Sequence, residues 1–195
     1  MTFIKALLIV DVQNDFCPGG ALAVLEGDKI VPSLNKYISF FSKNKLPIFF
    51  SRDWHPKKTK HFKKFKGIWP VHCVENTTGA QFHPKLKMPK QGIILSKGMN
   101  PQEDSYSAFQ AQDSQGKGFI NLLNILGIDE IYVGGLATDY CVKSSVTDAL
   151  KNGFKVKLLM DAIKGVNLKP EDSKKAIDGM INLGAHKITL SKIRH

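Results

Sequence analysis

Six short apolar runs, each four to eight residues long, constrain the fold of this chain more than any other feature. They are continuous rather than alternating and rich in Val, Ile, Leu and Phe. Runs of this kind are typical of strands that are buried on both faces of a parallel sheet. The runs are residues 3–10, 46–51, 92–96, 130–135, 154–160 and 187–190.

Four stretches between these runs have the periodicity or the boundary residues of helices. Residues 29–44 place apolar side chains on one helical face, and the other three stretches end at or just before a glycine, a common residue after a helix C-terminus. The four stretches are residues 29–44, 117–126, 139–152 and 170–183. Strands alternating with helices predict a three-layer α/β/α fold around a central, mostly parallel six-stranded sheet.

One connection breaks this alternation. Residues 52–91 have no clear period and contain four of the six histidines of the chain. A long irregular connection inside a compact domain is usually functional. Since 195 residues fit one domain with a full core, we expect a single domain over residues 1–195 that carries a metal-binding flap at about residues 52–91.

Hydropathy and cysteine content indicate the compartment. No apolar run approaches the roughly 20 residues of a membrane span, and the first apolar run ends at Asp11 rather than at a small-residue cleavage site. Cys17, Cys73 and Cys141 are an odd number without the spacing of a metal site, which favours free thiols. We expect a cytoplasmic protein with no membrane partner, and the sequence leaves open whether it forms a homo-oligomer.

The formal charge of +11 raises the question of a nucleic-acid partner. Only two of the 28 basic residues, Arg52 and Arg194, are arginines, whereas proteins that bind phosphates favour the bidentate arginine side chain. Solubility therefore explains the charge better, and no nucleic-acid partner is expected. Six lysines between Lys57 and Lys66 keep one alternative open, a non-catalytic module that binds anions, and the sequence does not decide their purpose.

Polar side chains of different chemistry follow four of the predicted strands. Asp11 follows the first strand, Asp53 and His55 follow the second, Lys97 follows the third, and Cys141 lies just beyond the fourth. Each alone has an ordinary explanation as a turn residue, a solvated strand end or a small buried side chain. Ligands of open parallel sheets bind beyond the carboxyl ends of the strands, so the joint placement predicts a site at this edge.

The segment "GGLATDYCVKSS" suggests how Cys141 becomes reactive. A helix that begins near Thr138 or Asp139, both good N-cap residues, would place Cys141 in its first turn. Free backbone N–H groups there favour a thiolate, and a nearby Lys97 would lower the pKa of the thiol further. Asp11 would then carry the proton. The two glycines, 134 and 135, fit either an oxyanion pocket or a tight strand-to-helix turn.

A second cluster has the residue types of a metal site. Asp53 and His55 are two residues apart in an extended segment, so both can point the same way, and His72 can return from the flap to join them. Two imidazoles and one carboxylate with open positions suit a divalent metal. His61 and His83 are weaker candidates.

Six blocks of sequence, in this order, resemble those of a known family: "LLIVDVQNDFCPGGAL", "SRDWHP", "WPVHCVENTTGAQFHPKL", "LSKG", "DSYSAF" and "GLATDYCVKSSVTDAL". From Leu7 to the last predicted helix, the chain resembles the nicotinamidases of the isochorismatase-like cysteine hydrolase superfamily, whose fold is Rossmann-like. The resemblance implies deamidation of nicotinamide, and also of pyrazinamide, through a cysteine thioester in NAD salvage. It implies a triad of Asp11, Lys97 and Cys141, with the backbone N–H groups of Ala137 and Cys141 as the oxyanion hole and a cis peptide before Ala137.

The resemblance also implies a divalent metal, most often Zn²⁺ with Mn²⁺ or Fe²⁺ as alternatives, that faces the pyridine nitrogen. Its ligands would be Asp53, His55 and His72. Many relatives have a histidine six residues after the aspartate, whereas His61 lies eight residues after Asp53, so it is either a ligand or a residue just outside the ligand shell.

The aromatic residues implied to contact the substrate ring are Phe16, Trp69 and Tyr106. Flat aromatic faces suit a neutral heteroaromatic amide. Phe16 and Trp69 could instead pack in the core, and Tyr106 could supply a structural hydroxyl. The nearest functional alternative is a metal-free relative that acts on another amide or on a vinyl ether such as isochorismate, and the Asp53–His55 pair argues against it.

Overall fold

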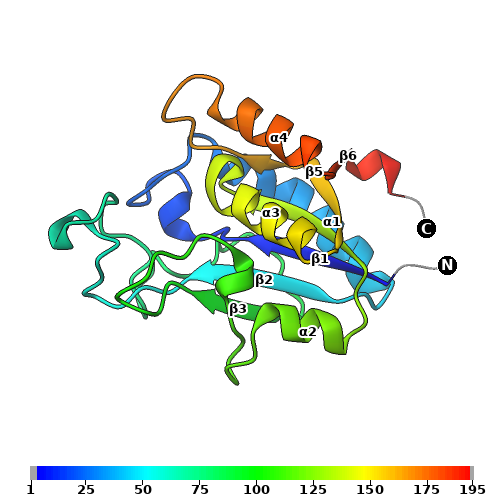
Figure 1. Cartoon of the computed structure of the whole chain (residues 1–195), viewed down its shortest axis with the longest axis horizontal. Helices are drawn as coiled ribbons and strands as arrows, with labels where there is room; N and C mark the ends of the chain where they lie inside the picture. The colour runs from blue at the N-terminus through cyan, green and yellow to red at the C-terminus, as the bar shows by residue number, and fades with distance from the viewer. Residues whose placement is uncertain (1–3, 194–195) are drawn as a thin grey trace.

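The computed structural model describes residues 4–193, and its strands form one six-stranded sheet with the order β3-β2-β1-β4-β5-β6 (Figure 1). Every neighbouring pair is parallel. The strands are β1 (Lys5–Val10), β2 (Ile48–Asp53), β3 (Ile93–Lys97), β4 (Glu130–Leu136), β5 (Lys155–Lys164) and β6 (His186–Ile188). The predicted α/β/α fold class is confirmed.

The helices are α1 (Val31–Lys43), α2 (Phe119–Ile125), α3 (Lys143–Lys151) and α4 (Asp172–Asn182). All four were expected from the sequence, and helical structure leading into the third begins at Thr138 as expected, but its first turn is of a different type. Residues Thr138–Val142 form a wider π-helical turn, and regular α-helix begins only at Lys143. None of the helices between residues 4 and 193 has the length and hydropathy needed to cross a membrane.

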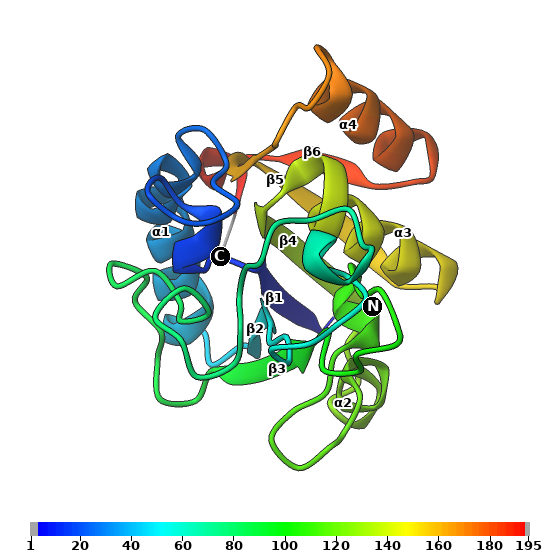
Figure 2. The ribbon, with the colours of Figure 1, turned by 90° about the vertical axis from the view of Figure 1, so that its left-hand side faces the viewer.

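The sheet separates two apolar cores, and Figure 2 shows helices on both of its sides. Helix α1 covers one face, and α2, α3 and α4 cover the other. Strand β1 serves both cores, because Leu8 and Val10 point to one face while Leu7 and Ile9 point to the other. Burial on both faces explains why its sequence is continuously apolar. One sheet carries all of the described strands, and the expectation of a single domain stays a prediction.

The strand order reverses between β1 and β4, because the chain leaves β1 toward β2 on one side and leaves β4 toward β5 on the other. Open α/β sheets bind ligands at the carboxyl end of such a switch point. Gly135 allows the two strands to lie side by side there: its φ is +124°, and a Cβ at this position would lie 2.1 Å from the carbonyl oxygen of Val10. Gly134 and Gly135 therefore belong to β4 rather than to a turn after it, and their part in an oxyanion pocket stays a prediction.

The long connection between β2 and β3 is irregular apart from single turns such as the 3-10 turn Lys63–Phe65. It begins after Asp53, slightly later than predicted, because β2 pairs with β3 up to Asp53 and Lys97. Part of this connection forms one end of the long axis of the molecule, at the left of Figure 1. The expected flap covered about residues 52–91, and from here on the word flap means only residues 54–72.

Candidate active site

Lys97 brings three of the predicted site residues together at the carboxyl edge of the sheet. Its Nζ lies 2.9 Å from Asp11 Oδ2 and 3.6 Å from Cys141 Sγ, and it also donates a hydrogen bond to Asp53 Oδ1. One oxygen from each carboxylate and the sulfur all lie within 4.8 Å of one another. Two carboxylates and a thiol could hold a metal ion, but the Lys97 ammonium already supplies the positive charge here.

The local backbone aims the Asp11 carboxylate at this point. Asp11 follows β1 with a φ of +48°, a left-handed conformation that aspartate adopts more readily than most residues. Its N–H donates to the carbonyl of Ser51 at 3.1 Å, and the Ser51 hydroxyl donates to Asp11 Oδ1 at 2.6 Å. Strand β2 therefore fixes both the backbone and the side chain of Asp11.

Cys141 lies in the π-helical turn that follows β4. The expected N-cap role of Thr138 or Asp139 is wrong, because the turn has no side-chain cap at its start. Asp139 instead accepts hydrogen bonds from the backbone N–H groups of Val166 and Asn167, at 2.9 and 2.7 Å. Asp139 therefore joins the turn that contains Cys141 to the loop after β5.

Charges in this cluster are set by burial and by the ammonium. Burial would lower the pKa of Lys97, but Asp11 and Asp53 hold it well above its ordinary value. Burial would raise the pKa of Asp53, but Lys97 and His55 hold it far below its usual range. Burial raises the pKa of Asp11, and the opposing effects of Lys97 and the Ser51 hydroxyl are smaller. Asp11 is thus the more basic of the two carboxylates.

The predicted lowering of the Cys141 pKa is contradicted. Burial raises the pKa of the thiol, Lys97 lowers it, and the two nearby carboxylates raise it again, so that the pKa lies well above its ordinary value. One ammonium cannot offset burial together with two negative charges. Cys141 therefore rests as a neutral thiol, and the sequence had not suggested how many carboxylates would face it.

Three histidines gather beside Asp53. One ring nitrogen from each of His55, His61 and His72 lies within 4.8 Å of those of the other two. The Asp53 Oδ2 atom lies 3.7 Å from His55 Nε2 and 4.0 Å from His72 Nε2. His61 thus joins the three residues that were expected to bind a metal, whereas His83 lies apart, in a groove beside α1.

Each histidine is held through its Nδ1 atom, so Nε2 is the ring nitrogen that can bind a metal. His55 Nδ1 lies 3.0 Å from the carbonyl oxygen of Gly98, and His72 Nδ1 lies 2.8 Å from that of Pro70. His61 Nδ1 lies 2.7 Å from the carboxylate of Asp104. Outer partners of this kind orient imidazoles that bind metals. Gly98 is required beside His55, because a Cβ there would lie 2.4 Å from the ring.

The donor set fits a divalent metal ion. Burial lowers the pKa of His72 to about 4 and also lowers that of His61, so both rings are neutral at pH 7 and can donate lone pairs. His55 Nε2 is buried without a hydrogen-bond partner among the described residues. Three imidazoles and one carboxylate are ligands that suit zinc and the related transition metals.

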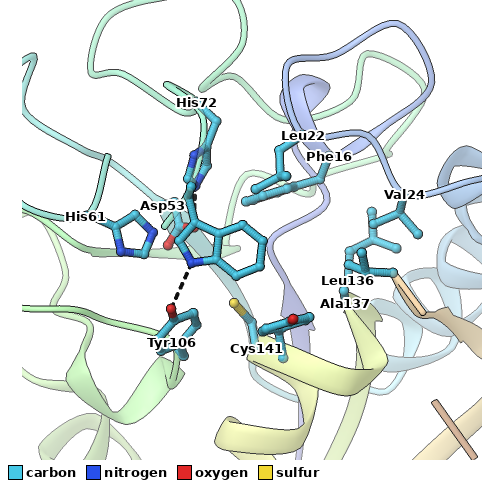
Figure 3. A pocket seen from close by; sticks show the side chains of 13 residues that line it. Phe16, Leu22, Val24, Asp53, His61, His72, Tyr106, Leu136, Ala137 and Cys141 are labelled. Atoms are coloured by element: carbon cyan, nitrogen blue, oxygen red, sulfur yellow. Dashed lines mark hydrogen bonds and ion pairs between the residues drawn. The ribbon is translucent and has the colours of Figure 1, made fainter. Parts of the chain in front are cut away.

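A small, mostly apolar pocket opens beside both clusters. In Figure 3, Asp53, His61 and His72 lie on one side, Val24, Leu136 and Ala137 lie on the other, and Cys141 lies below and between them. The residues expected to contact the substrate ring, Phe16, Trp69 and Tyr106, all line this pocket. The Tyr106 hydroxyl also accepts a hydrogen bond from Trp69 Nε1 at 2.8 Å, so it has a structural role as well.

The backbone of Ala137 reaches the same pocket. The peptide bond before it is cis, as the family resemblance implied. Ala137 and Cys141 both line the pocket, and the Ala137 carbonyl accepts hydrogen bonds from Tyr140 and Val142 within the turn. The assignment of their N–H groups to an oxyanion hole stays a prediction.

Several supporting residues were missed from the sequence. Buried Gln13 accepts from the backbone N–H of Asp53 and donates to the carbonyls of Asp53 and Ala80, all at 2.8–2.9 Å. Its place two residues after Asp11, at the same sheet edge, was the signal that could have found it. Nothing in the sequence pairs Ser51 with Asp11 or Asp104 with His61.

Comparison with known proteins places this geometry in a family. The isochorismatase domain model matches residues 5–192, nearly the whole chain. The chain belongs to the isochorismatase family. The nicotinamidase of Escherichia coli strain K12 is 42% identical to this isochorismatase-family chain over an alignment 203 positions long, which covers 96% of this chain and 95% of the relative.

Two solved structures extend the comparison. A pyrazinamidase of Pyrococcus horikoshii, in complex with zinc, has a TM-score of 0.88 and 42% identity, and the match covers 96% of this chain and 99% of that one. A protein of L. infantum, in complex with nicotinate, has a TM-score of 0.86 and 32% identity, with 97% and 94% of the two chains covered. The likeness therefore includes the flap as well as the sheet.

The contact between Asp104 and His61 generates a prediction about metal affinity. Replacing the carboxylate in Asp104→Asn removes the charged partner that orients the imidazole, so the affinity for zinc should fall about 10- to 100-fold. Competition with a chromogenic chelator measures this directly. Glu103→Gln is the matched control, because Glu103 is an exposed neighbour whose side chain contacts none of the histidines in the described part of the chain. Equal affinity of the two variants would contradict a positioning role for Asp104.

Proposed function

We propose that this protein hydrolyses nicotinamide to nicotinic acid and ammonia, acts on pyrazinamide in the same way, and serves NAD salvage. The observation that carries the proposal is the shared pocket: the Cys141 thiol, which contacts a buried ammonium, opens to the same space as Asp53, His61 and His72 of the histidine cluster. The nicotinamidase and pyrazinamidase relatives support the choice of substrate.

The substrate ring would lie between the apolar walls, with Phe16 and Trp69 as stacking partners. Phe16 itself packs near the metal-binding side, with its ring centroid 5.5 Å from that of His72. Asp53, His55, His61 and His72 would hold the metal, and a zinc ion there would supply a Lewis acid for the pyridine nitrogen. The carboxamide would then point toward Cys141.

The first half of the reaction forms a thioester. Because Cys141 rests as a thiol, its proton passes to Asp11 as the sulfur attacks the carboxamide carbon. The N–H groups of Ala137 and Cys141 would stabilise the oxyanion. When the C–N bond breaks, Asp11 returns the proton to the leaving nitrogen, and ammonia departs.

Water completes the second half. Asp11 removes a proton from a water molecule as its oxygen attacks the thioester carbon, the C–S bond breaks, and the thiolate takes the proton back from Asp11. The net reaction consumes one water and releases nicotinic acid and ammonia. Lys97 stays an ammonium throughout, because its pKa is held well above its ordinary value, and it balances the charge that moves between the sulfur and Asp11.

The two alternative functions are less well supported. A metal-free relative has no need of three histidines that each have an anchored Nδ1 atom and an Nε2 atom that can bind a metal. A non-catalytic binding module has no need of a thiol, a carboxylate and an ammonium buried together beside a pocket.

The direct test is release of ammonia from nicotinamide. The wild-type protein should release it, and a chelator should lower the rate by weakening the binding of the ring, with recovery when zinc is added. Cys141→Ala should lower kcat by at least about 10⁴-fold, because it removes the nucleophile. Mass spectrometry of the quenched wild-type reaction should detect an acyl group on Cys141.

Cys73→Ala is the matched control, because Cys73 is equally buried but does not line the pocket. Steady turnover by Cys141→Ala, or the absence of ammonia release from a folded, zinc-loaded wild-type protein, would contradict the proposal.

The hydrogen bond from Ser51 to Asp11 predicts a change in the pH profile. Burial raises the pKa of Asp11, and the Ser51 hydroxyl lowers it by stabilising the ionised form. Ser51→Ala removes this stabilisation, so the pKa of Asp11 should rise further. The acid limb of kcat/KM, which reports the ionised base, should move toward higher pH.

The pH profile of Ser105→Ala provides the control, since the buried Ser105 hydroxyl has no hydrogen-bond partner among the described residues. That variant should keep the wild-type acid limb. If the acid limb of kcat/KM of the Ser51→Ala variant moves toward lower pH, Asp11 is not the base.

A further inference from the structure

The proposed reaction gives no role to the six lysines of residues 57–66. Nicotinamide is neutral, so a positive field does not steer it to the pocket. Exposed charges are also screened beyond about 8 to 10 Å in physiological salt, which limits their effect on the buried thiol. The lysines therefore call for an explanation outside the reaction.

The flap has two faces of opposite character. Its inner face is buried and carries Thr59, His61, Phe62 and Trp69. The exposed side chains of the flap, which together we call the lysine face, are six lysines and two aliphatic residues: Lys57, Lys58, Lys60, Lys63, Lys64, Lys66, Ile68 and Val71. Ile68 is 68% exposed and Val71 is 46% exposed, so two aliphatic side chains lie in water among the lysines.

The flap is held in place from within. The N–H of Lys60 donates to the carbonyl of Pro101, the N–H of Lys63 donates to the carbonyl of Trp69, and His61 bonds to Asp104. These bonds use the backbone or inner side chains, so the ammonium groups of the lysine face are left to solvent. The lysines are thus presented on an ordered loop.

The charges of the lysine face are not neutralised within the protein. A few exposed lysines outside the flap pair with carboxylates, as Lys29 and Lys164 do with Glu26. No lysine of the flap forms an ion pair with any residue from 4 to 193. Residues 54–74 contain no acidic residue at all, and the nearby Asp104 is bonded to His61.

We propose that the lysine face docks on anionic phospholipid headgroups at a membrane surface. Clusters of four to eight basic residues bind such surfaces, and each lysine near the surface strengthens binding about fivefold. Ile68 and Val71 can enter the boundary between headgroups and acyl chains. The flap lies at one end of the longest axis of the molecule, so it can meet a flat surface before the rest of the protein does (Figures 1 and 2).

This inference departs from the expectation of no membrane partner, which rested on the lack of a spanning segment. Docking at a surface needs no such segment.

Two other anionic partners fit the lysine face less well. Single-stranded nucleic acid is held by exposed aromatic side chains on which bases stack. The flap instead buries Phe62 and Trp69 and half-buries Phe65. Its Trp54 ring is half-buried and covered by Arg52. Protein interfaces are depleted in lysine and enriched in aromatic residues and arginine, which is the opposite of this composition. Lipid headgroups require only point charges and some exposed apolar surface.

Co-sedimentation with lipid vesicles tests the proposal, using the full-length protein loaded with zinc. The wild type should bind vesicles of equimolar phosphatidylcholine and phosphatidylglycerol, should not bind phosphatidylcholine alone, and should dissociate at high salt. The triple variant Lys63→Gln, Lys64→Gln, Lys66→Gln should bind the anionic vesicles about 100-fold more weakly. Ile68→Ser should weaken binding roughly tenfold, because an aliphatic contact is lost.

The matched control is the triple variant Lys85→Gln, Lys87→Gln, Lys90→Gln, which removes the same charge from exposed lysines outside the flap. It should bind vesicles nearly as well as the wild type. Ammonia release from nicotinamide should be unchanged in both triple variants, which checks that they are folded. The vesicle measurement does not use nicotinamide, so its outcome is independent of the proposed reaction.

Three results would overturn the proposal. Equal loss of vesicle binding in the two triple variants would mean that net charge alone is responsible. A wild-type protein that ignores anionic vesicles would exclude lipid as the partner. Tighter binding to a single-stranded oligonucleotide than to the vesicles would assign the lysine face to nucleic acid instead.

Discussion

The ammonium group of Lys97 is the contact on which the site depends. Asp11, Asp53 and Cys141 come from three different strand ends, and each prefers water to the interior in its charged form. Two carboxylates this close repel by about 4 kcal/mol even at an effective dielectric constant near 20. Lys97 bonds to both carboxylates and contacts the sulfur, so the three groups can be buried together. One of the carboxylates, Asp11, can then serve as the proposed base. The same ammonium links the thiol to the metal side, since Asp53 belongs to both groups.

The fold supplies this contact through the order of its strands. Lys97 ends β3, Asp53 ends β2 and Asp11 follows β1, so three adjacent parallel strands deliver the lysine and its two carboxylates to one edge. The thiol arrives from β4 across the switch point, where α1 and α3 leave on opposite faces of the sheet. The flap then returns over this edge and adds His61, Trp69 and His72, so that the proposed substrate ring and metal would share one chamber.

Much of this could be predicted from the sequence, because buried parallel strands leave a clear signal and ligands bind at their carboxyl ends. Apolar runs located all six strands, and the residues following them located Asp11, Asp53, Lys97 and Cys141. The electrostatics could not be predicted in the same way. The pKa of Cys141 depends on how many carboxylates face it and how deeply it is buried, and both are properties of the assembled edge. Asp139 looked like a helix cap, but its partners Val166 and Asn167 lie on a distant loop. The expected roles of the site residues stay predictions until they are measured.

The coupling free energy between Lys97 and Asp11 tests the central role of the ammonium most directly. It is obtained by urea unfolding of the wild type, Lys97→Met, Asp11→Asn and the double variant. The pKa of Lys97 is raised, so its contribution to the free energy of unfolding is complete below a pH of about 10. The pKa of Asp53 is lowered, so its contribution is complete above a pH of about 4. Both contributions are therefore complete at neutral pH. Lys97→Met alone should cost about 3 to 5 kcal/mol, and the double variant should be more stable than additivity predicts by at least about 1 kcal/mol. Additivity within about 0.5 kcal/mol would contradict the account, because Lys97 and Asp11 would then be independent.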